Sequence, residues 1–187
     1  RWPVTRENHS RYWENLNRGK LSVALNLSDA KGRELLQELV RSTGQFITNF
    51  PADGFLSHAT LAEGRADLVT VRVMGWADGS PALDYTVNNA VGYPMVTGPG
   101  HDPVNHVLPA WDLLSGAYAA FALLAAIQNR AATGEGSEVR VPLSDVAIGT
   151  LANLGGIAEV LYSGENRPRV GNAVYGLFGR DFVTADG

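Results

Sequence analysis

Residues 21–50 read LSVALNLSDAKGRELLQELVRSTGQFITNF, and they predict a strand, a helix and a second strand in succession. Over 21–27, apolar residues alternate with small or polar ones, which is typical of a strand. Ser28 or Asp29 can cap the helix that follows, and Gly44 can end it. Residues 45–50 form the second predicted strand. The inner face of the helix is expected to carry four apolar side chains: Leu35, Leu36, Leu39 and Val40.

The alternation of strands and helices continues beyond Pro51, which closes the second strand. A weaker helix pattern covers 55–63, and an apolar strand covers 67–74. Strands that alternate with helices predict a parallel sheet with right-handed crossovers, and therefore the α/β class. Residues 75–111 are rich in glycine and proline and predict a long irregular loop, of the kind that often carries function.

The second half contains the clearest single element, a helix over 113–132 that Gly134 ends. Its many alanines allow neighbouring elements to approach closely, so we expect most of this helix to be buried. A strand over 138–143 follows, and then one helix over about 144–162, capped by the serine or aspartate at its start.

Two domains are expected on this pattern. Residues 1–163 would form a partial large α/β domain, and 164–187 a linker with the first strand, 181–184, of a smaller domain. The chain opens and stops abruptly, so we expect both ends to be cut from a longer protein.

Composition excludes several classes of protein. The chain has 187 residues and no cysteine, which rules out disulfides, a thiolate nucleophile and a cysteine zinc site. Its net charge is −4, and the basic residues gather toward the N-terminus, which argues against a nucleic-acid partner but leaves room for a phosphorylated small molecule. Residues 113–127 are judged too short to span a bilayer. A soluble, cytoplasmic protein without a membrane partner is therefore expected.

Common catalytic motifs are missing from the sequence. There is no G-x-S-x-G elbow, no H-E-x-x-H and no Walker-type phosphate loop. His101 and His106 lie five residues apart but lack acidic partners at metal-ligand spacing, so we expect no metal site. Asp78 and Asp102 belong to Asp-Gly and Asp-Pro turns and are interpreted as structural, whereas Asp84 could cap a short helix.

Asp112 is the carboxylate with the most informative setting, because it directly precedes the long alanine-rich helix. One interpretation is an N-cap whose carboxylate accepts the N–H of Ser115. The other is a nucleophile whose anion the helix N-terminus stabilises. A carboxylate that attacks a thioester forms a mixed anhydride and so preserves the activation of the acyl group. The two roles are compatible, and spacing alone leaves both open.

Several motifs occur in a fixed order along the chain. Residues 17–25 (NRGKLSVAL) precede 32–36 (GRELL), 112–118 (DLLSGAY), 130–136 (RAATGEG) and 139–146 (VRVPLSDV). Together they are similar to the signatures N-R-x-K-R-S-V-x-L-D, G-R-E-x-L, D-x-x-[ST]-G, R-x-x-T-G-x-G and V-x-V-x-L-x-D-A of family III CoA-transferases. The resemblance covers essentially the whole chain. It implies a doubly wound parallel sheet, a smaller second domain, and two chains interlocked as a homodimer.

Other segments resemble a branch of this family that moves CoA between two carboxyl groups of one acid. These segments are 1–5, 84–88, 103–112 and 179–182. The resemblance aligns Asp112 with the catalytic aspartate of the family. It also implies that four residues of these segments contact the acyl group or its second carboxylate: Tyr85, Asn88, Asn105 and His106.

The resemblance also implies where CoA is held, at the ends of the first two predicted strands. CoA would enter as part of an acyl-CoA substrate, with no permanently bound cofactor. Ser28 stands where some members have lysine, and Ser57 and His58 occupy the region of a family arginine. The pyrophosphate is therefore expected to rely on Lys20, on Arg18 or on residues outside this sequence. The remaining candidates are Leu25, Asn26, Leu27 and Ser28, together with Asn49, Phe50 and Pro51.

Three other functions stay open at this stage. An intermolecular CoA-transferase would need a separate free acid, and a non-catalytic acyl-CoA-binding homologue would be expected to lack Asp112. An NAD-type oxidoreductase on a similar sheet would need a glycine fingerprint that is missing from this sequence.

Overall fold

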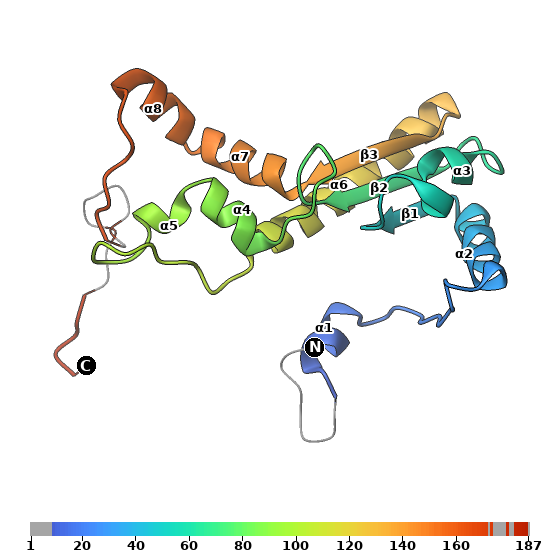
Figure 1. The fold of residues 1–187 in the computed structure, drawn as a ribbon, viewed down its shortest axis with the longest axis horizontal. Coiled ribbons are helices and arrows are strands. Elements are labelled where there is room, and N and C mark those ends of the chain that lie inside the picture. The colour runs from blue at the N-terminus through green and yellow to red at the C-terminus, as the bar shows by residue number, and fades with distance from the viewer. Residues whose placement is uncertain (1–8, 172, 174–178, 180–181, 187) are drawn as a thin grey trace. The chain divides into compact units, whose positions relative to one another are not determined.

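The chain forms two compact units, residues 1–36 and 37–187, which we describe separately. The computed structural model describes residues 9–171, 173, 179 and 182–186 (Figure 1). The segment at 1–5 and part of 179–182, both used in the resemblance, lie outside these residues.

The first unit begins with α1 (Arg11–Leu16), which Ser10 caps by accepting the N–H of Trp13. Residues 20–26 that follow have no regular secondary structure. The strand expected over 21–27 is therefore wrong, and Leu21 is fully exposed (100%). A strand needs a neighbour for its backbone hydrogen bonds, and this segment pairs with none of the described strands.

Helix α2 (Ala30–Thr43) forms as predicted and joins the two units. Asp29 caps it, because its Oδ1 accepts the N–H of Lys31 at 2.7 Å, and Gly44 ends it with a φ of +72°. The expected inner face is only half right. Val40 is buried, but Leu35 and Leu39 are exposed, because no described element covers that side of the helix.

The second unit is built on three parallel strands in the order β1-β2-β3 (Figure 1). These are β1 (Gln45–Thr48), β2 (Val69–Met74) and β3 (Ser137–Pro142). Between β1 and β2 lie the 3-10 turn η1 (Gly54–Leu56) and α3 (His58–Ala62). The expected α/β class with a parallel sheet is confirmed.

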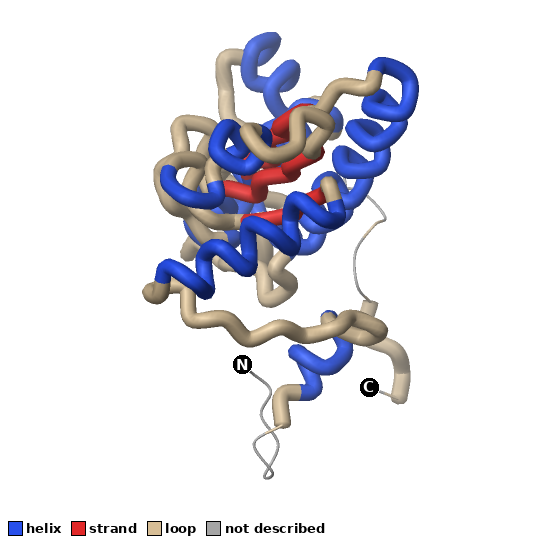
Figure 2. Tube along the Cα trace, turned by 90° about the vertical axis from the view of Figure 1, so that its right-hand side faces the viewer, coloured by secondary structure: helices blue, strands red, loops and turns tan. Residues whose placement is uncertain are grey.

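Each face of the sheet is covered by different elements, as the two-residue period of strands requires. On one face, Val71 and Val141 pack with Ala119 and Val146, which belong to the two helices described next. On the other face, the Arg72 guanidinium reaches the carbonyl of Leu56 in η1. Helices therefore flank the strands on both sides, as Figure 2 shows.

The longest element is α6 (Ala110–Thr133), which packs along β2 and β3, and α7 (Leu143–Asn153) follows β3. Gly134, at a φ of +77°, ends α6 as predicted. Gly136 then passes so close to Leu68 that an added Cβ would lie 2.3 Å from its carbonyl oxygen. The turn between α6 and β3 therefore depends on both glycines.

Two expectations about α6 are wrong. It is not mostly buried, because only one stripe (Trp111, Ser115, Ala119 and Ala126) faces the rest of the molecule, whereas Phe121 is 71% exposed. It is also long and apolar enough by composition alone to cross a membrane, with a mean hydropathy of 1.6 over 18 residues. Core helices of soluble proteins meet the same criterion.

The segment 75–111 is not an irregular loop throughout. It contains α4 (Asp84–Ala90) and α5 (Tyr93–Val96), separated by Gly92 in the left-handed region. The helix expected over 144–162 is likewise two helices, α7 and α8 (Gly156–Ser163), which meet at 63° where Gly155 adopts a φ of +80°. In each place a left-handed glycine, Gly92 or Gly155, directly precedes the second helix.

The remaining expectations concern helix α7 and the tail. Neither Ser144 nor Asp145 caps α7, because the helix begins at Leu143 directly after Pro142. The strand expected over 181–184 is not formed by its described part, 182–184.

Candidate active site

Asp112 lies in the first turn of α6, as its third residue. The N-cap position is Pro109, so the expectation that Asp112 caps the helix through the N–H of Ser115 is wrong. The helix begins three residues earlier than the sequence pattern indicates. The Asp112 side chain is consequently free of a capping role and is solvent-accessible.

Asp84 caps α6 instead, from a distant part of the chain. Its Oδ2 accepts the N–H of Trp111 at 2.7 Å and the N–H of Asp112 at 3.3 Å. Asp84 is the first residue of α4, whose own N-cap is Leu83, and it is only 2% exposed. Sequence reasoning missed this role, because a carboxylate 27 and 28 residues before the two N–H groups that it binds leaves no local signature.

His106 is held by the same carboxylate. Its Nε2 lies 2.8 Å from Asp84 Oδ1. The imidazole packs edge-on against the ring of Tyr85, with centroids 6.0 Å apart, and lies 6.3 Å from the Trp111 ring. Tyr85 itself is half exposed. Two of the four predicted acyl-contact residues therefore lie together beside the start of α6.

Asn88 and Asn105, the other two predicted acyl-contact residues, join the same cluster. The Asn88 Nδ2 donates to Asn105 Oδ1 at 2.6 Å, and its Oδ1 accepts the Trp111 indole N–H at 3.2 Å. Asn105 Oδ1 also accepts the N–H of His106. Asn88 is 2% exposed. Both polar atoms of its amide therefore bond within the cluster, and the contact of Asn88 with the acyl group stays a prediction.

The electrostatics of the cluster are dominated by its carboxylates. Partial burial, and then the negative charge of Asp84, raise the pKa of Asp112 above its ordinary value of 3.8. The sequence has no lysine or arginine between residues 73 and 129. Asp112 is thus an accessible carboxylate with increased basicity, which suits a nucleophile.

The cluster lies where the strands β2 and β3 end. Trp111 packs with Val87, Leu143 and Ala147 in one buried group, against which Val73 of β2 also packs. Leu143 follows directly on β3. The carboxyl ends of parallel strands are the usual ligand-binding edge of such sheets.

The loop after β1, which holds the predicted CoA contacts Asn49, Phe50 and Pro51, is fixed by a buried arginine. Arg72 Nη1 donates to the carbonyls of Phe50 and Pro51 at 2.7 and 2.8 Å, while its Nε donates to Glu138 Oε1 at 2.9 Å. Arg72 is 1% exposed. Sequence reasoning missed this role of Arg72, because an arginine in a strand is ordinarily expected to point into solvent.

The other predicted CoA contacts belong to the first unit. Asn26 Oδ1 accepts the N–H of Ser28 at 3.1 Å, in a turn against which Gly32 packs so closely that an added Cβ would lie 2.1 Å from the Asn26 carbonyl oxygen. Leu25 and Leu27 are partly buried. Lys20 Nζ donates to the Leu16 carbonyl at 2.8 Å, within its own unit.

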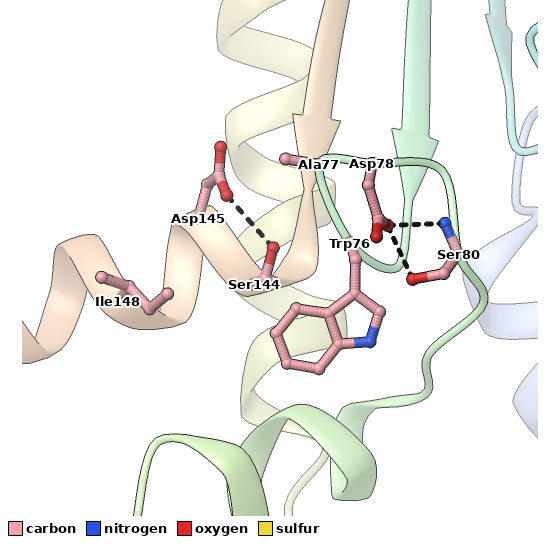
Figure 3. Close-up of a pocket in the computed structure, with 7 residues that line it drawn as sticks. All are labelled: Trp76, Ala77, Asp78, Ser80, Ser144, Asp145 and Ile148. Atoms are coloured by element: carbon pink, nitrogen blue, oxygen red, sulfur yellow. Dashed lines mark hydrogen bonds between the residues drawn. The ribbon is translucent and has the colours of Figure 1, made fainter.

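A separate open pocket of about 500 Å³ lies beside the ends of β2 and β3 (Figure 3). Asp78 lines it and accepts the N–H and the hydroxyl of Ser80 at 2.9 and 2.7 Å, which confirms its structural role. Asp145 accepts the Ser144 hydroxyl at 3.1 Å. Trp76 adds an aromatic wall. Two carboxylates make this pocket a poor site for the phosphates of CoA.

A model of one protein family matches the chain over residues 1–187, and its description is CoA-transferase family III. The chain is 49% identical to 2-methylfumaryl-CoA isomerase of Chloroflexus aurantiacus, over all of this chain and 47% of that protein. It is 30% identical to a succinate–glutarate CoA-transferase of Agrobacterium fabrum, over 94% of this chain and 46% of that protein.

A solved structure of a CaiB/BaiF family protein from Brucella suis is also similar. It superposes with a TM-score of 0.78 at 26% identity, over 86% of this chain and 44% of that chain. The chain therefore spans about half the length of the curated relatives and the solved structure that it matches.

Proposed function

The chain belongs to CoA-transferase family III, and on this premise we propose that the whole protein moves CoA between the C1 and C4 carboxyl groups of 2-methylfumaryl (mesaconyl)-CoA. The observation that carries the proposal is the cluster around Asp112. Asp112 is an accessible carboxylate of raised pKa on the helix turn whose N–H groups bind Asp84, and the same Asp84 carboxylate holds the imidazole of His106. The chain is also 49% identical to a 2-methylfumaryl-CoA isomerase.

The proposed reaction uses Asp112 as a covalent nucleophile. One carboxylate oxygen attacks the C1 thioester carbon, the C–S bond breaks, and CoA leaves as a thiolate from a mixed anhydride. The thiolate then attacks the aspartyl carbon of the anhydride, which gives an aspartyl–CoA thioester and the free dicarboxylate. The C4 carboxylate attacks the carbonyl carbon of this thioester, the C–S bond breaks, and a second anhydride forms with release of the CoA thiolate. The thiolate finally attacks the C4 carbonyl and regenerates the Asp112 carboxylate.

The free carboxylate of the substrate needs a partner that recognises it without attacking it. We assign this role to His106 and Asn105, with Tyr85 against the methylfumaryl carbon chain. Asn88 holds Asn105 in place through the 2.6 Å hydrogen bond between the two amides. A substrate that carries both acid groups needs no second acid, so CoA transfer is intramolecular.

The CoA portion is proposed to lie on the segment 20–28, which forms no strand, and on the loop that follows β1. The candidates are Lys20, Leu25, Asn26, Leu27 and Ser28 of the first unit, and Asn49, Phe50 and Pro51 of the second. We further propose that the protein acts as a homodimer in the cytoplasm and needs no permanently bound cofactor.

The test is to incubate the whole protein with mesaconyl-C1-CoA and no free acid, and to follow the C1 and C4 isomers by chromatography. Interconversion by the wild type that is lost in Asp112→Asn supports the proposal. Asp102→Asn, in an exposed turn, serves as the matched carboxylate control. An Asp112→Asn protein that still interconverts the isomers at the wild-type rate contradicts it.

A second candidate is intermolecular transfer to a separate dicarboxylate, since the chain is 30% identical to a succinate–glutarate CoA-transferase. The same assay separates the two proposals. CoA exchange that appears only after addition of a free dicarboxylate favours the intermolecular reaction.

A further inference from the structure

Asp84 is a buried carboxylate whose partners carry no fixed positive charge. It is 2% exposed. Its partners in the described part of the chain are the backbone N–H groups of Trp111 and Asp112 and the imidazole of His106. Burial of a charge costs free energy unless hydrogen bonds satisfy both oxygens, and here each oxygen has a partner.

We propose that Asp84 is a positioning residue for the transfer reaction, an inference that rests on the proposed function. Its Oδ2 binds the first turn of α6, which carries Asp112, and its Oδ1 holds the imidazole of His106. One side chain thus fixes the distance between two groups. The first is the nucleophile Asp112, and the second is the His106 ring that is proposed to bind the free carboxylate of the substrate.

A capping role alone does not account for this geometry. A cap needs one acceptor oxygen, which Asn, Ser or Thr supplies without a charge. Here the second oxygen faces a ring from a loop 22 residues further along the chain. A carboxylate can only accept, so the imidazole must donate to Asp84 through Nε2. Nδ1 is left for a ligand, and it can bind the free carboxylate of the substrate only when it carries a hydrogen as well.

Replacement by asparagine tests this arrangement. Asp84→Asn keeps the shape of the side chain, but an amide has only one acceptor oxygen where the carboxylate has two. An amide that accepts the Trp111 N–H presents N–H groups to His106, and the ring must then accept at Nε2 and carry its hydrogen on Nδ1. The separation and the tautomer both change. Loss of the charge also removes one cause of the raised pKa of Asp112.

The experiment compares Asp84→Asn, Asp102→Asn and the wild type in the whole protein, by kcat, KM and their pH dependence. We expect kcat of Asp84→Asn to fall by about 100-fold, with KM nearly unchanged, and the acid limb of kcat/KM to move to lower pH. A variant that merely loosens the fold has no reason to move that limb in this direction. Asp102→Asn is expected to match the wild type.

Mass spectrometry of the quenched wild type separates the two proposals. If an adduct forms on Asp112 while Asp84→Asn keeps the wild-type kcat and acid limb, the inference about Asp84 is overturned and the proposed function stands. If no adduct forms on Asp112, both are overturned. Should Asp84→Asn not fold, nitrogen-15 NMR of wild-type His106 decides the matter. Hydrogen on Nε2 is expected, whatever Nδ1 carries, and a ring without hydrogen on Nε2 overturns the inference.

Discussion

The imidazole of His106 is the single side chain that most directly tests recognition of the acyl group. It lies beside Tyr85 and Trp111, with its Nε2 on Asp84. We predict that His106→Ala lowers kcat/KM for mesaconyl-CoA by about 10- to 100-fold, because a hydrogen bond to a charged group is worth about 1.5–3 kcal/mol. CoA affinity, measured by calorimetry, is expected to change little.

The neighbouring histidine provides the control for that prediction. His101 is exposed and lies in the same loop, so His101→Ala is expected to leave both kcat/KM and CoA affinity unchanged. Equal rates for His106→Ala and the wild type remove His106 from the site.

The ionisation of the Asp112 side chain is expected to set the pH dependence of kcat/KM in acid. In the proposed mechanism the attacking species is the carboxylate, so we predict that kcat/KM falls about tenfold per pH unit below the pKa of this group. Partial burial and the charge of Asp84 raise that pKa above 3.8, and the acid limb is therefore expected above the range of an ordinary aspartate. A limb at or below that range contradicts the prediction. Titration of the free substrate by NMR supplies the control, because its own carboxyl group ionises in acid.

At the scale of secondary-structure elements, Arg72 of β2 holds the loop after β1 through hydrogen bonds to its carbonyls. Its removal leaves the Phe50, Pro51 and Leu56 carbonyls without these hydrogen bonds and Glu138 without its buried partner. We predict that Arg72→Met lowers the free energy of unfolding by about 3–5 kcal/mol, as breaking a buried ion pair does. Urea denaturation measures it.

Arg140 is the matched control, because it bonds the same Glu138 from the exposed side at 3.1 Å. Arg140→Met is expected to cost at most about 1 kcal/mol. A loss for Arg72→Met no larger than this contradicts the prediction.

The dependence of the free energy of unfolding on pH tests the Arg72–Glu138 ion pair independently. Burial alone would raise the pKa of Glu138, but the hydrogen bonds from Arg72 and Arg140, with their charges, outweigh it and hold the pKa below 4.5. The stabilisation is present above that value and is lost as pH falls through the lowered pKa. Arg72→Met is expected to lose part of this acid sensitivity.

The elements that local patterns specify were predicted best. The parallel strands and the end of α6 at Gly134 follow from alternation and from one left-handed glycine. The pattern at 21–27 was equally clear and gave no strand, because strand pairing depends on partners that a local pattern does not contain. Glycines also divide segments in ways that periodicity misses, as at Gly155.

The site shows the same division between local and long-range signals. The resemblance brought together Tyr85, Asn88, Asn105 and His106, and they do lie in one cluster. Asp84 and Arg72 were missed, because each acts on backbone groups 16 to 28 residues away in the sequence. The spacing of apolar residues along a strand or helix does not predict such long-range contacts.

At the scale of the whole molecule, the outer face of α6 exposes large apolar side chains to solvent. Tyr118, Phe121 and Leu124 are 49%, 71% and 66% exposed, and the chain spans about half the length of its curated relatives. Contiguous apolar surface of this kind marks an interaction site. We therefore predict that residues 1–187 alone self-associate, bind a hydrophobic dye, bind CoA weakly and do not turn over.

A charge placed on that face tests the prediction directly. Phe121→Glu is expected to reduce dye binding and self-association of the 187-residue chain, because it breaks the apolar stripe while glutamate preserves helix propensity. Asn129→Asp, at another exposed position of α6 that lies about 80° around the helix from Phe121, adds the same charge off the line of Phe121 and should change neither. Size-exclusion chromatography with light scattering reports the association, and the isomer assay reports turnover. A monomeric wild-type chain that binds no dye contradicts the assignment of the face, and robust turnover would mean that residues 1–187 already contain a complete site.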